Sequence, residues 1–440
     1  MARLNIPPTP IYTHEGARAA RINSELQLRR SIMSCLLWEN EFYEDGVEIA
    51  ARIADLIPKV KPDVVAAMAI EAREKSKLRH IPLFIVCEMA KLPSHKVLVA
   101  KTLEQIIQRV DELTEYLAIY WKGGRCPVSA QSKRGLAKAF LKFNEYELAK
   151  YNRGNEIKLR DALFLCHAKP KDKEQDELWK RLIDNKLAVP DTWEVTLSAK
   201  DDLSKKEKWE RLLREKKLGA LALLRNLRNM ETEKVDQALI KESILSMKTE
   251  RVLPFRFIAA AGYAPRLEPY LEQSMMKCLE NFEKLLGKTF LVVDVSGSMG
   301  DQISGKSEIS RMDAACGLAI LARELCENID IYSFSSDIKQ IPPRHGFALR
   351  DAIVRSQSHS STNLGTALDL VYQNATAENR IIIITDEQSH QDIRQPICQG
   401  YLINVASAKN GIGYGKWIHI DGWSESVFDY IREYEKIATQ

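Results

Sequence analysis

The sequence contains no apolar run that approaches the ~20 residues a membrane-spanning helix requires. Its first residues, MARLNIPPTPIYTHEG, lack the apolar core of a secretory signal. Both absences argue against a membrane or secreted protein. We therefore expect a cytoplasmic protein with no membrane partner.

Cysteine is present, but never in the spacing of a metal site or a redox motif. The eight cysteines are scattered without any CxxC pair, and several lie inside apolar stretches such as FIVCEMA (84–90). This usage predicts buried, reduced thiols and argues against a disulfide framework or a zinc site.

The signature motifs of two enzyme classes are also missing. There is no GxSxG, and nothing places His345 or His359 beside Ser296 or Ser298. There is no GxxxxGK[ST] loop, and KNGIGYGK (409–416) lacks the context such a loop requires. A hydrolase or nucleotide-using enzyme therefore has little support and remains a third alternative.

What the chain does have is a concentration of positive charge. Residues 122–229 hold 26 Lys and Arg against 16 Asp and Glu, although the whole chain has a net charge of only +4. Residues 288–440, in contrast, hold 14 basic and 19 acidic residues. A surface of this composition suits a polyanionic partner, and the alternative is a set of solvated helix faces.

From about residue 20 to 286 the apolar spacing is helical. Residues recur at i, i+3, i+4 and i+7 in the segments 49–57, 63–75, 81–92, 97–120 and 208–230. Prolines separate the segments, and successive helices with short links predict an α-solenoid. We assign residues 1–20 to an extended N-terminal segment and residues 21–286 to this helical domain.

Beyond residue 287 the period changes to that of short strands alternating with helices. Strands are predicted at 289–296, 329–335, 379–387 and 400–407, and helices at 312–328 and 364–375. This alternation predicts a second domain over residues 287–440, an α/β doubly wound sheet of parallel strands.

Oxygen-bearing side chains follow these strands. The stretch TFLVVDVSGSMG (289–300) places Asp294, Ser296 and Ser298 at alternate positions after the first strand, Thr362 precedes a helix, and Asp386 ends a central strand. Ligands bind beyond the carboxyl ends of parallel strands, so we expect these five side chains to converge. Hard oxygens with few charges suit one divalent metal ion, Mg²⁺ above all. The alternative is that Asp294 and the serines cap the next helix.

This set resembles the metal-ion-dependent adhesion site of von Willebrand factor A domains, with DxSxS, Thr and Asp in that order. In such domains the metal usually keeps one position open for a partner's carboxylate. The resemblance therefore implies ligation and not chemistry.

The basic block contains amphipathic helices. In KRGLAKAFLKFNEYELAKY (133–151), Arg134, Lys138 and Lys142 share one side of a helical wheel, opposite Leu136, Phe140 and Phe143. In EIKLRDALFLCHAKP (156–170), the inward stripe is Leu159, Leu163 and Cys166. His167 follows in the last turn, where a histidine by itself is more often structural.

The stretches KRGLAKAFLKFNEYELAKYN (133–152), LRDALFLCHAKP (159–170) and DVSGSM (294–299) together resemble the Ro autoantigen family, whose helical part is called the TROVE module. The resemblance covers about residues 15–440. It implies HEAT-like helical repeats forming a ring, followed by a von Willebrand factor A domain. Shorter loops than in the animal proteins suggest a bacterial or phage-type member.

The resemblance also implies a function: Y RNA on a basic outer surface and single-stranded ends of misfolded RNA in a central hole. We expect a non-catalytic monomer in RNA quality control or noncoding RNA stability, with an exoribonuclease such as polynucleotide phosphorylase as a candidate partner. The chief alternative is a protein–protein adaptor whose metal site holds an acidic partner. The RNA contacts carried over from the family are Lys133, Arg134, Lys138, Lys142, Lys150, Arg153, Lys158, Arg160, His167 and Lys169.

Aromatic residues near the basic block are candidates for stacking on unpaired bases. At helical spacing such residues are more often core, and the sequence leaves both interpretations open for Tyr120, Trp121, Tyr146, Tyr151 and Trp179.

Overall fold

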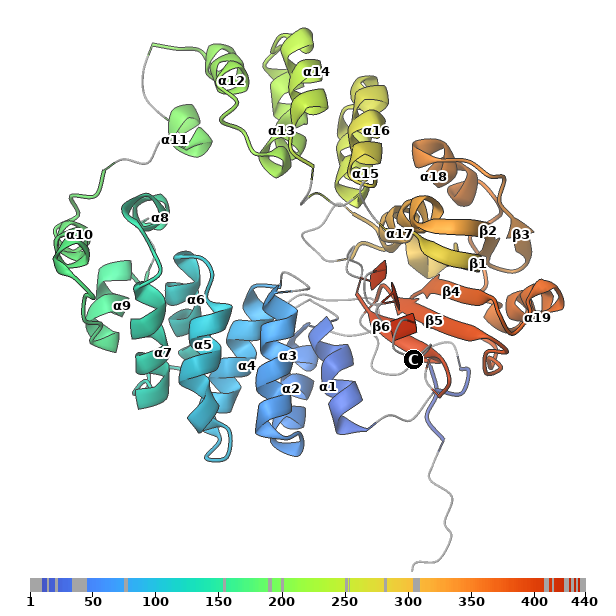
Figure 1. Ribbon diagram of the computed structural model, residues 1–440, viewed down its shortest axis with the longest axis horizontal. Coiled ribbons are helices and arrows are strands. Elements are labelled where there is room, and N and C mark those ends of the chain that lie inside the picture. The colour runs from blue at the N-terminus through green and yellow to red at the C-terminus, as the bar shows by residue number, and fades with distance from the viewer. Residues whose placement is uncertain are drawn as a thin grey trace, which may run out of the picture. The chain divides into compact units, whose positions relative to one another are not determined.

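A computed structural model of the chain (Figure 1) describes most of the sequence. The described residues are 10–13, 16–19, 23–33, 46–74, 78–152, 156–188, 192–198, 202–249, 252, 254–280, 283–303, 309–406, 411–413, 415–422, 427–428, 431–432 and 434–435.

The chain divides into two compact units. The helical unit consists of residues 23–37 and 47–201, and the mixed unit consists of residues 1–22, 38–46 and 202–440. The predicted boundary at residue 287 follows the change of secondary structure, since β1 (Leu285–Asp294) begins there. The boundary between the two compact units lies earlier, near residue 202, because the helices that follow it belong to the same unit as the sheet.

The helical unit is built from helices that stack on their second neighbours. Helix α3 packs on α5, α5 on α7 and α7 on α9, while α4 packs on α6. This alternation is that of an α-solenoid, and it confirms the predicted architecture of this part. The helices are α1 (Ser24–Met33), α2 (Gly46–Leu56), α3 (Pro62–Glu74), α4 (His80–Lys91), α5 (Val99–Ile106), α6 (Asp111–Tyr120), α7 (Ala130–Phe140), α8 (Glu145–Tyr151), α9 (Leu159–Cys166), α10 (Lys173–Ile183) and α11 (Trp193–Ser198).

The segment 97–120, expected to be helical throughout, is interrupted. It forms a 3₁₀ turn (Lys96–Leu98), α5 and α6. The buried carboxylate of Glu112 accepts hydrogen bonds from the main-chain amides of Gln108 (2.8 Å) and Arg109 (3.0 Å), and its other oxygen pairs with Arg73 at 2.7 Å. These bonds satisfy two main-chain amides in the link between α5 and α6 and fix the break.

The mixed unit begins with a second set of stacked helices. They are α12 (Lys205–Arg214), α13 (Ala220–Thr232), α14 (Gln237–Ser246), α15 (Pro254–Tyr263) and α16 (Glu268–Lys277). Helix α12 packs on α14 and α14 on α16, while α13 packs on α15. The predicted segment 208–230 is therefore two helices, separated at Gly219, where α13 has its N-cap.

The sheet of the mixed unit has the strand order β3-β2-β1-β4-β5-β6. The strands are β1, β2 (Cys326–Phe334), β3 (Ile338–Gln340), β4 (Arg380–Thr385), β5 (Gln399–Asn404) and β6 (Ile418–Asp421), and only β3 pairs antiparallel. The short strands β3 and β6 were not predicted.

Helices accompany the sheet: α17 (Arg311–Leu325), α18 (Gly346–Val354) and α19 (Leu364–Asn374). Helix α19 packs its buried residues on Phe290 and Val292 of β1, while Leu291 and Val293 alternate to the other face and are fully buried. Helix α17 packs against β1 and β2. This arrangement is the expected α/β doubly wound fold of a von Willebrand factor A domain.

The described part of the N-terminal segment belongs to the mixed unit. Tyr12 and Arg18 form an antiparallel bridge, and Ala17 is buried in the core of the sheet. The Thr13 hydroxyl donates to the carbonyl of Ser389 at 3.1 Å, which places this segment next to the loop that follows β4.

The described cysteines are free thiols, and Cys87, Cys166, Cys316 and Cys326 are buried as expected. Cys126 is exposed, and Cys35 lies outside the described residues. None of the helices described here combines the length and the apolar character that crossing a membrane demands.

Candidate functional site

Three loops meet at the carboxyl edge of the sheet, where the strand order reverses between β1 and β4. The Gly297 amide lies 3.4 Å from the Ser360 carbonyl, and the His390 amide donates to the Thr362 carbonyl at 3.2 Å. This is the position at which open α/β sheets bind ligands. The loops that carry the five predicted metal ligands are thus brought together.

Asp294 ends β1 with a fully buried carboxylate. One oxygen accepts a hydrogen bond from the Ser296 amide (2.9 Å), and the other accepts one from the Thr385 hydroxyl (2.6 Å). Burial, and next the charge of the nearby Asp386, raise the pKa of Asp294 to about 7. Two carboxylates therefore share one buried site.

Asp386 is also fully buried, directly after β4. The Ser298 hydroxyl donates to its Oδ2 at 2.6 Å, and the Gln388 amide donates to its Oδ1 at 3.2 Å. The Ser296 and Ser298 hydroxyls lie 3.4 Å apart. Four of the five predicted ligands thus form one connected group.

Thr362 is buried beside this group. Its carbonyl accepts a hydrogen bond from the Ser389 hydroxyl (3.1 Å), and its amide donates to Nδ1 of His390 (3.2 Å). These contacts hold the main chain of Thr362 against the loop that follows β4.

The capping alternative finds no support in these contacts. Helix α17 is capped by Ser310, which exchanges hydrogen bonds with Asp313 in a capping box. The short 3₁₀ turn Gly297–Gly300 begins after Ser296, and the Ser296 side chain makes no capping bond to it. The polar side chains of residues 294–298 therefore face one another instead of capping a helix.

Arg311 is the residue of this site that the sequence did not reveal. It begins α17, is 1% exposed, and places Nη1 3.6 Å from Oδ2 of Asp386 and 3.3 Å from the carbonyl of Ser298. A guanidinium here offsets one of the two buried negative charges.

The donor set fits a hard divalent cation: two carboxylates, with the hydroxyls of Ser296 and Ser298 within their reach. The described residues contain no cluster of three or more His, Cys, Asp or Glu side chains arranged for a metal ion. The predicted site has only two carboxylates and relies on hydroxyls, so it is of a different kind. The metal stays a prediction.

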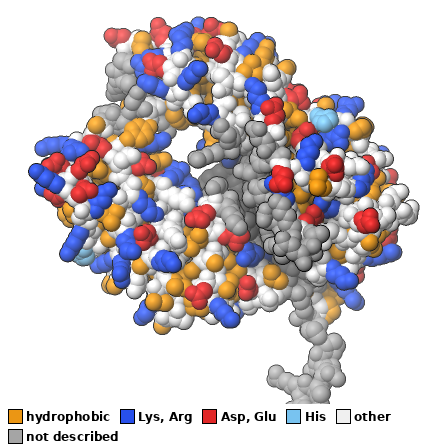
Figure 2. Space-filling model, in the orientation of Figure 1, with side chains coloured by type: hydrophobic (Ala, Val, Ile, Leu, Met, Phe, Trp, Pro, Cys, Tyr) orange, Lys and Arg blue, Asp and Glu red, His pale blue; other side chains and the backbone are white. Residues whose placement is uncertain are grey.

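The predicted RNA-binding residues that the structure describes lie on α7, α8, α9 and the adjoining loops of the helical unit. The inward stripes are confirmed, since Leu136, Phe140, Leu159, Leu163 and Cys166 are all less than 5% exposed. The opposite faces carry the cations. Figure 2 shows that Lys and Arg side chains over α9 and α10 are interspersed with Asp and Glu side chains.

Some of these cations are already engaged. Lys138 pairs with Glu104 at 3.0 Å, and Arg160 lies 3.6 Å from Asp161. Lys142 donates to the carbonyls of Glu104 and Ile107 (3.0 Å to Ile107) at the end of α5, and burial lowers its pKa. Lys142 thus has a structural role, and its role in RNA binding remains a prediction.

Other cations of the set have no ion-pair partner among the residues that the structure describes. These are Lys133, Arg134, Lys158 and Lys169, and all but Lys133 are exposed. Lys150 lies 5.7 Å from the ring of Tyr151. Arg153 lies outside the described residues.

His167 ends α9 in the left-handed region, with φ 53° and ψ 41°, and its side chain is exposed. Glycine or asparagine usually fills such a position, because a side chain there costs about 1 kcal/mol. The exposed imidazole is accessible to a ligand, and its role in RNA binding remains a prediction.

Most of the aromatic candidates are held by the fold. Trp179 is 4% exposed and packs edge-on against Phe140, which excludes it from stacking on a base. Trp121 donates its indole N–H to the carbonyl of Cys126. Tyr146 is half exposed, and so is Phe164 on α9, which the sequence analysis did not single out.

Known proteins support the class that these features define, a helical solenoid joined to a von Willebrand factor A domain. The TROVE domain family model matches residues 179–379. The crystal structure of the Ro (RSR) protein of Deinococcus radiodurans has the same fold, with a TM-score of 0.64 and 16% sequence identity over 92% of this chain and 98% of that chain. No curated protein matches the chain. The predicted resemblance to the Ro family is confirmed by this family-model match and by the shared fold.

Proposed function

We propose that this protein binds RNA without transforming it. Small structured, Y-like RNA binds the exposed cations of the helical unit, and single-stranded ends of misfolded or fragmentary RNA enter a central hole. The protein then acts in RNA quality control or noncoding RNA stability. The observation that carries the proposal is a set of exposed cations with no ion-pair partner among the described residues: Arg134 on α7, and Lys158 and Lys169 on either side of α9, together with the left-handed His167.

The physical basis is neutralisation of phosphates. Each contact releases counterions, so log K falls by about 0.7 to 0.9 per neutralised charge for each tenfold rise in salt. Cations that already pair with carboxylates contribute less, since their charge is offset. Arg134, Lys158 and Lys169 are therefore the residues on which affinity depends most.

The proposal includes one Mg²⁺ held by Asp294, Ser296, Ser298, Thr362 and Asp386. A bound divalent cation would supply a charged point for a partner's carboxylate. The residues around it orient one another: Thr385 fixes Asp294, and Ser298 fixes Asp386. In this proposal the protein acts as a monomer, and an exoribonuclease is a candidate partner.

The test compares two triple variants. Arg134→Ala/Lys158→Ala/Lys169→Ala removes unpaired cations, and Lys173→Ala/Lys180→Ala/Lys186→Ala removes cations of the same block that lie 4.0, 2.7 and 3.7 Å from carboxylates. The affinity for a stem-loop RNA is measured by fluorescence anisotropy at several salt concentrations. The RNA affinity of the first variant should fall at least tenfold, and the slope of log K against log salt concentration should become shallower by about 2. The affinity and slope of the second variant should stay close to those of wild type.

Equal affinity of wild type and the first variant, with both folded, would overturn the proposal. Turnover of RNA or nucleotide with Mg²⁺ that is lost in Asp386→Asn would establish an enzyme instead. Sequencing the RNA that copurifies with the wild-type protein identifies the ligand. If no RNA copurifies, the result would favour the alternative function, a protein–protein adaptor.

A further inference from the structure

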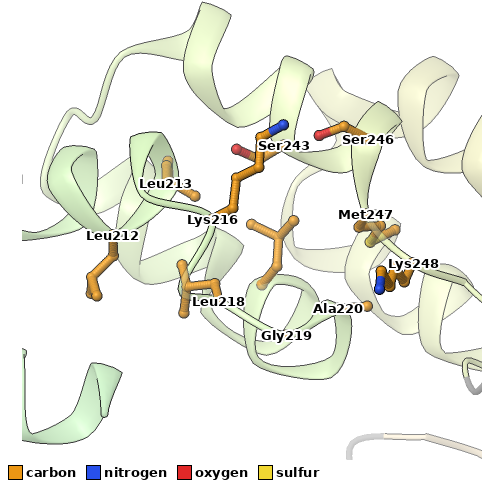
Figure 3. A pocket seen from close by; sticks show the side chains of 11 residues that line it. Leu212, Leu213, Lys216, Leu218, Gly219, Ala220, Ser243, Ser246, Met247 and Lys248 are labelled. Carbon is orange, nitrogen blue, oxygen red and sulfur yellow. The ribbon is translucent and has the colours of Figure 1, made fainter. Parts of the chain in front are cut away.

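A pocket of about 280 Å³ lies between α12, α13 and α14 in the mixed unit (Figure 3). It has apolar walls and two cations. Figure 3 shows Lys216 on the side of Ser243, and Lys248 beside Met247 and Ala220. None of these residues belongs to a predicted site.

The two lysines differ from the cations around them. On α12 and just after it, Arg214 lies 3.0 Å from Glu210 and Lys217 lies 2.8 Å from Glu215. Lys216 and Lys248 form no ion pair with any residue that the structure describes. Among the described residues, no carboxylate lines the pocket to offset these two positive charges, and such a lining suits an anionic ligand.

The end of α12 fixes the main chain of Lys216. Its amide donates to the Leu213 carbonyl (3.1 Å) and the Lys217 amide to the Leu212 carbonyl (3.0 Å), which is the Schellman pattern. Lys216 has a φ of 53° in the position that glycine prefers. The start of α13 adds further positive potential, because its N-cap Gly219 contributes no side chain to satisfy the first amides.

The apolar part of the pocket suits a flat ring. Leu212 and Leu223 are buried, and Leu218 and Met247 are half-buried in the lining. The volume lies just below the range of about 300–1,000 Å³ of sites for drug-sized ligands. One base fits these dimensions, whereas a duplex does not.

We propose that this pocket holds one unpaired nucleotide of bound RNA, with its phosphate at Lys216 and Lys248 and its base on Leu218, Leu223 and Met247. This proposal rests on the proposed function. The choice of RNA follows from charge complementarity and from position, since the pocket lies within the TROVE match and mostly within the basic stretch 122–229.

The chain offers a matched pair of variants. Lys234 ends α13 with φ 55° in the same Schellman pattern, its amide donating to Glu231 and the Val235 amide to Met230, and it does not line the pocket. Lys216→Gly and Lys234→Gly both replace a left-handed lysine by glycine. Both should fold, because glycine suits this conformation.

The probes are a ten-residue oligoadenylate, adenosine 5′-monophosphate and inorganic phosphate. The Met247 methyl resonance is followed by NMR and assigned with Met247→Leu, while anisotropy gives the affinity for the oligonucleotide. The oligonucleotide should shift the resonance in wild type and in Lys234→Gly. In Lys216→Gly the affinity should fall at least threefold, and in Lys216→Gly/Lys248→Ser at least tenfold.

If the oligonucleotide binds but the Met247 resonance does not shift, the proposal that this pocket holds a nucleotide is overturned. The proposed function would remain intact. A shift with adenosine 5′-monophosphate or phosphate but none with the oligonucleotide would assign the pocket to a free anion and overturn the RNA ligand. No binding of either the oligonucleotide or the stem-loop RNA would overturn both proposals.

Discussion

The guanidinium of Arg311 lies 3.6 Å from the carboxylate of Asp386, and both side chains are buried. The positive charge of Arg311 therefore occupies the surroundings in which we propose a metal ion. A guanidinium repels a divalent cation that is held by the same carboxylate, and over about 6 Å this repulsion amounts to roughly 5 kcal/mol at an effective dielectric of about 20.

The first prediction is that Arg311→Gln binds Mg²⁺ at least tenfold more tightly than wild type. Glutamine keeps a donor for the Ser298 carbonyl but removes the charge. The metal-free variant should unfold at a lower temperature, because the two carboxylates lose their counter-charge. Titration calorimetry gives the affinity and calorimetric unfolding the stability. Weaker Mg²⁺ binding in Arg311→Gln would show that the guanidinium positions Asp386 for the metal.

The second prediction concerns pH. An unfolded aspartate has a pKa of about 3.9, whereas burial and Asp386 raise the pKa of Asp294 to about 7 in the folded protein. Between these values the folded protein holds a proton that the unfolded chain has released. The free energy of unfolding of the metal-free protein should therefore fall as the pH rises from about 4 to 7.

In Asp294→Asn the side chain is neutral at every pH, so the free energy of unfolding of this variant should not show the decline between pH 4 and 7. Above pH 7, with a chelator present, it should be more stable than wild type by at least ~1 kcal/mol. It should also fail to bind Mg²⁺, whereas we expect wild type to bind one Mg²⁺. Urea unfolding across the pH range measures the difference, and Asp202→Asn, at an exposed position, is the control. An equal decline in Asp294→Asn and wild type would contradict the assignment.

The third prediction separates a structural cation from a binding one. Lys142 donates to two carbonyls at the end of α5, whereas Arg134 is exposed and has no ion-pair partner among the described residues. Lys142→Met should lower the free energy of unfolding by about 1–2 kcal/mol and lower RNA affinity less than Arg134→Met does. Arg134→Met should leave the free energy of unfolding close to that of wild type and cause the larger loss of RNA affinity. Urea unfolding measures the stability of both variants, and fluorescence anisotropy measures their RNA affinity. The opposite pattern would make Arg134 the structural cation and Lys142 the RNA-binding one.

The faces of the helices could be predicted from the sequence because their periodicity is local. Leu136, Phe140, Leu159 and Leu163 are buried where the helical wheel places them. The strands that end at Asp294 and just before Asp386 could be predicted for the same reason, since β1 contains the apolar run FLVV and β4 contains the β-branched run IIIIT. Strands β3 and β6 have three and four residues and too little apolar pattern to identify.

Features that depend on contacts between distant segments could not be predicted. Glu112 interrupts the helix expected over 97–120 because it is held by Arg73, on another helix. Arg311 reaches Asp386 only after the sheet has formed, and an arginine at the start of a helix carries no signal of that contact. The pocket that contains Lys216 likewise depends on how α12, α13 and α14 pack.

The last prediction concerns His167. Its main chain is left-handed at the end of α9, where glycine relieves strain, although glycine also gives the unfolded chain more freedom. His167→Gly should therefore be as stable as wild type or slightly more so. If the exposed imidazole contacts RNA, the same variant should lose at least threefold in affinity for the stem-loop RNA. Asn185, which is left-handed at the end of α10, provides the control Asn185→Gly, which should keep the wild-type affinity. Loss of stability without loss of affinity in His167→Gly would return the histidine to a structural role.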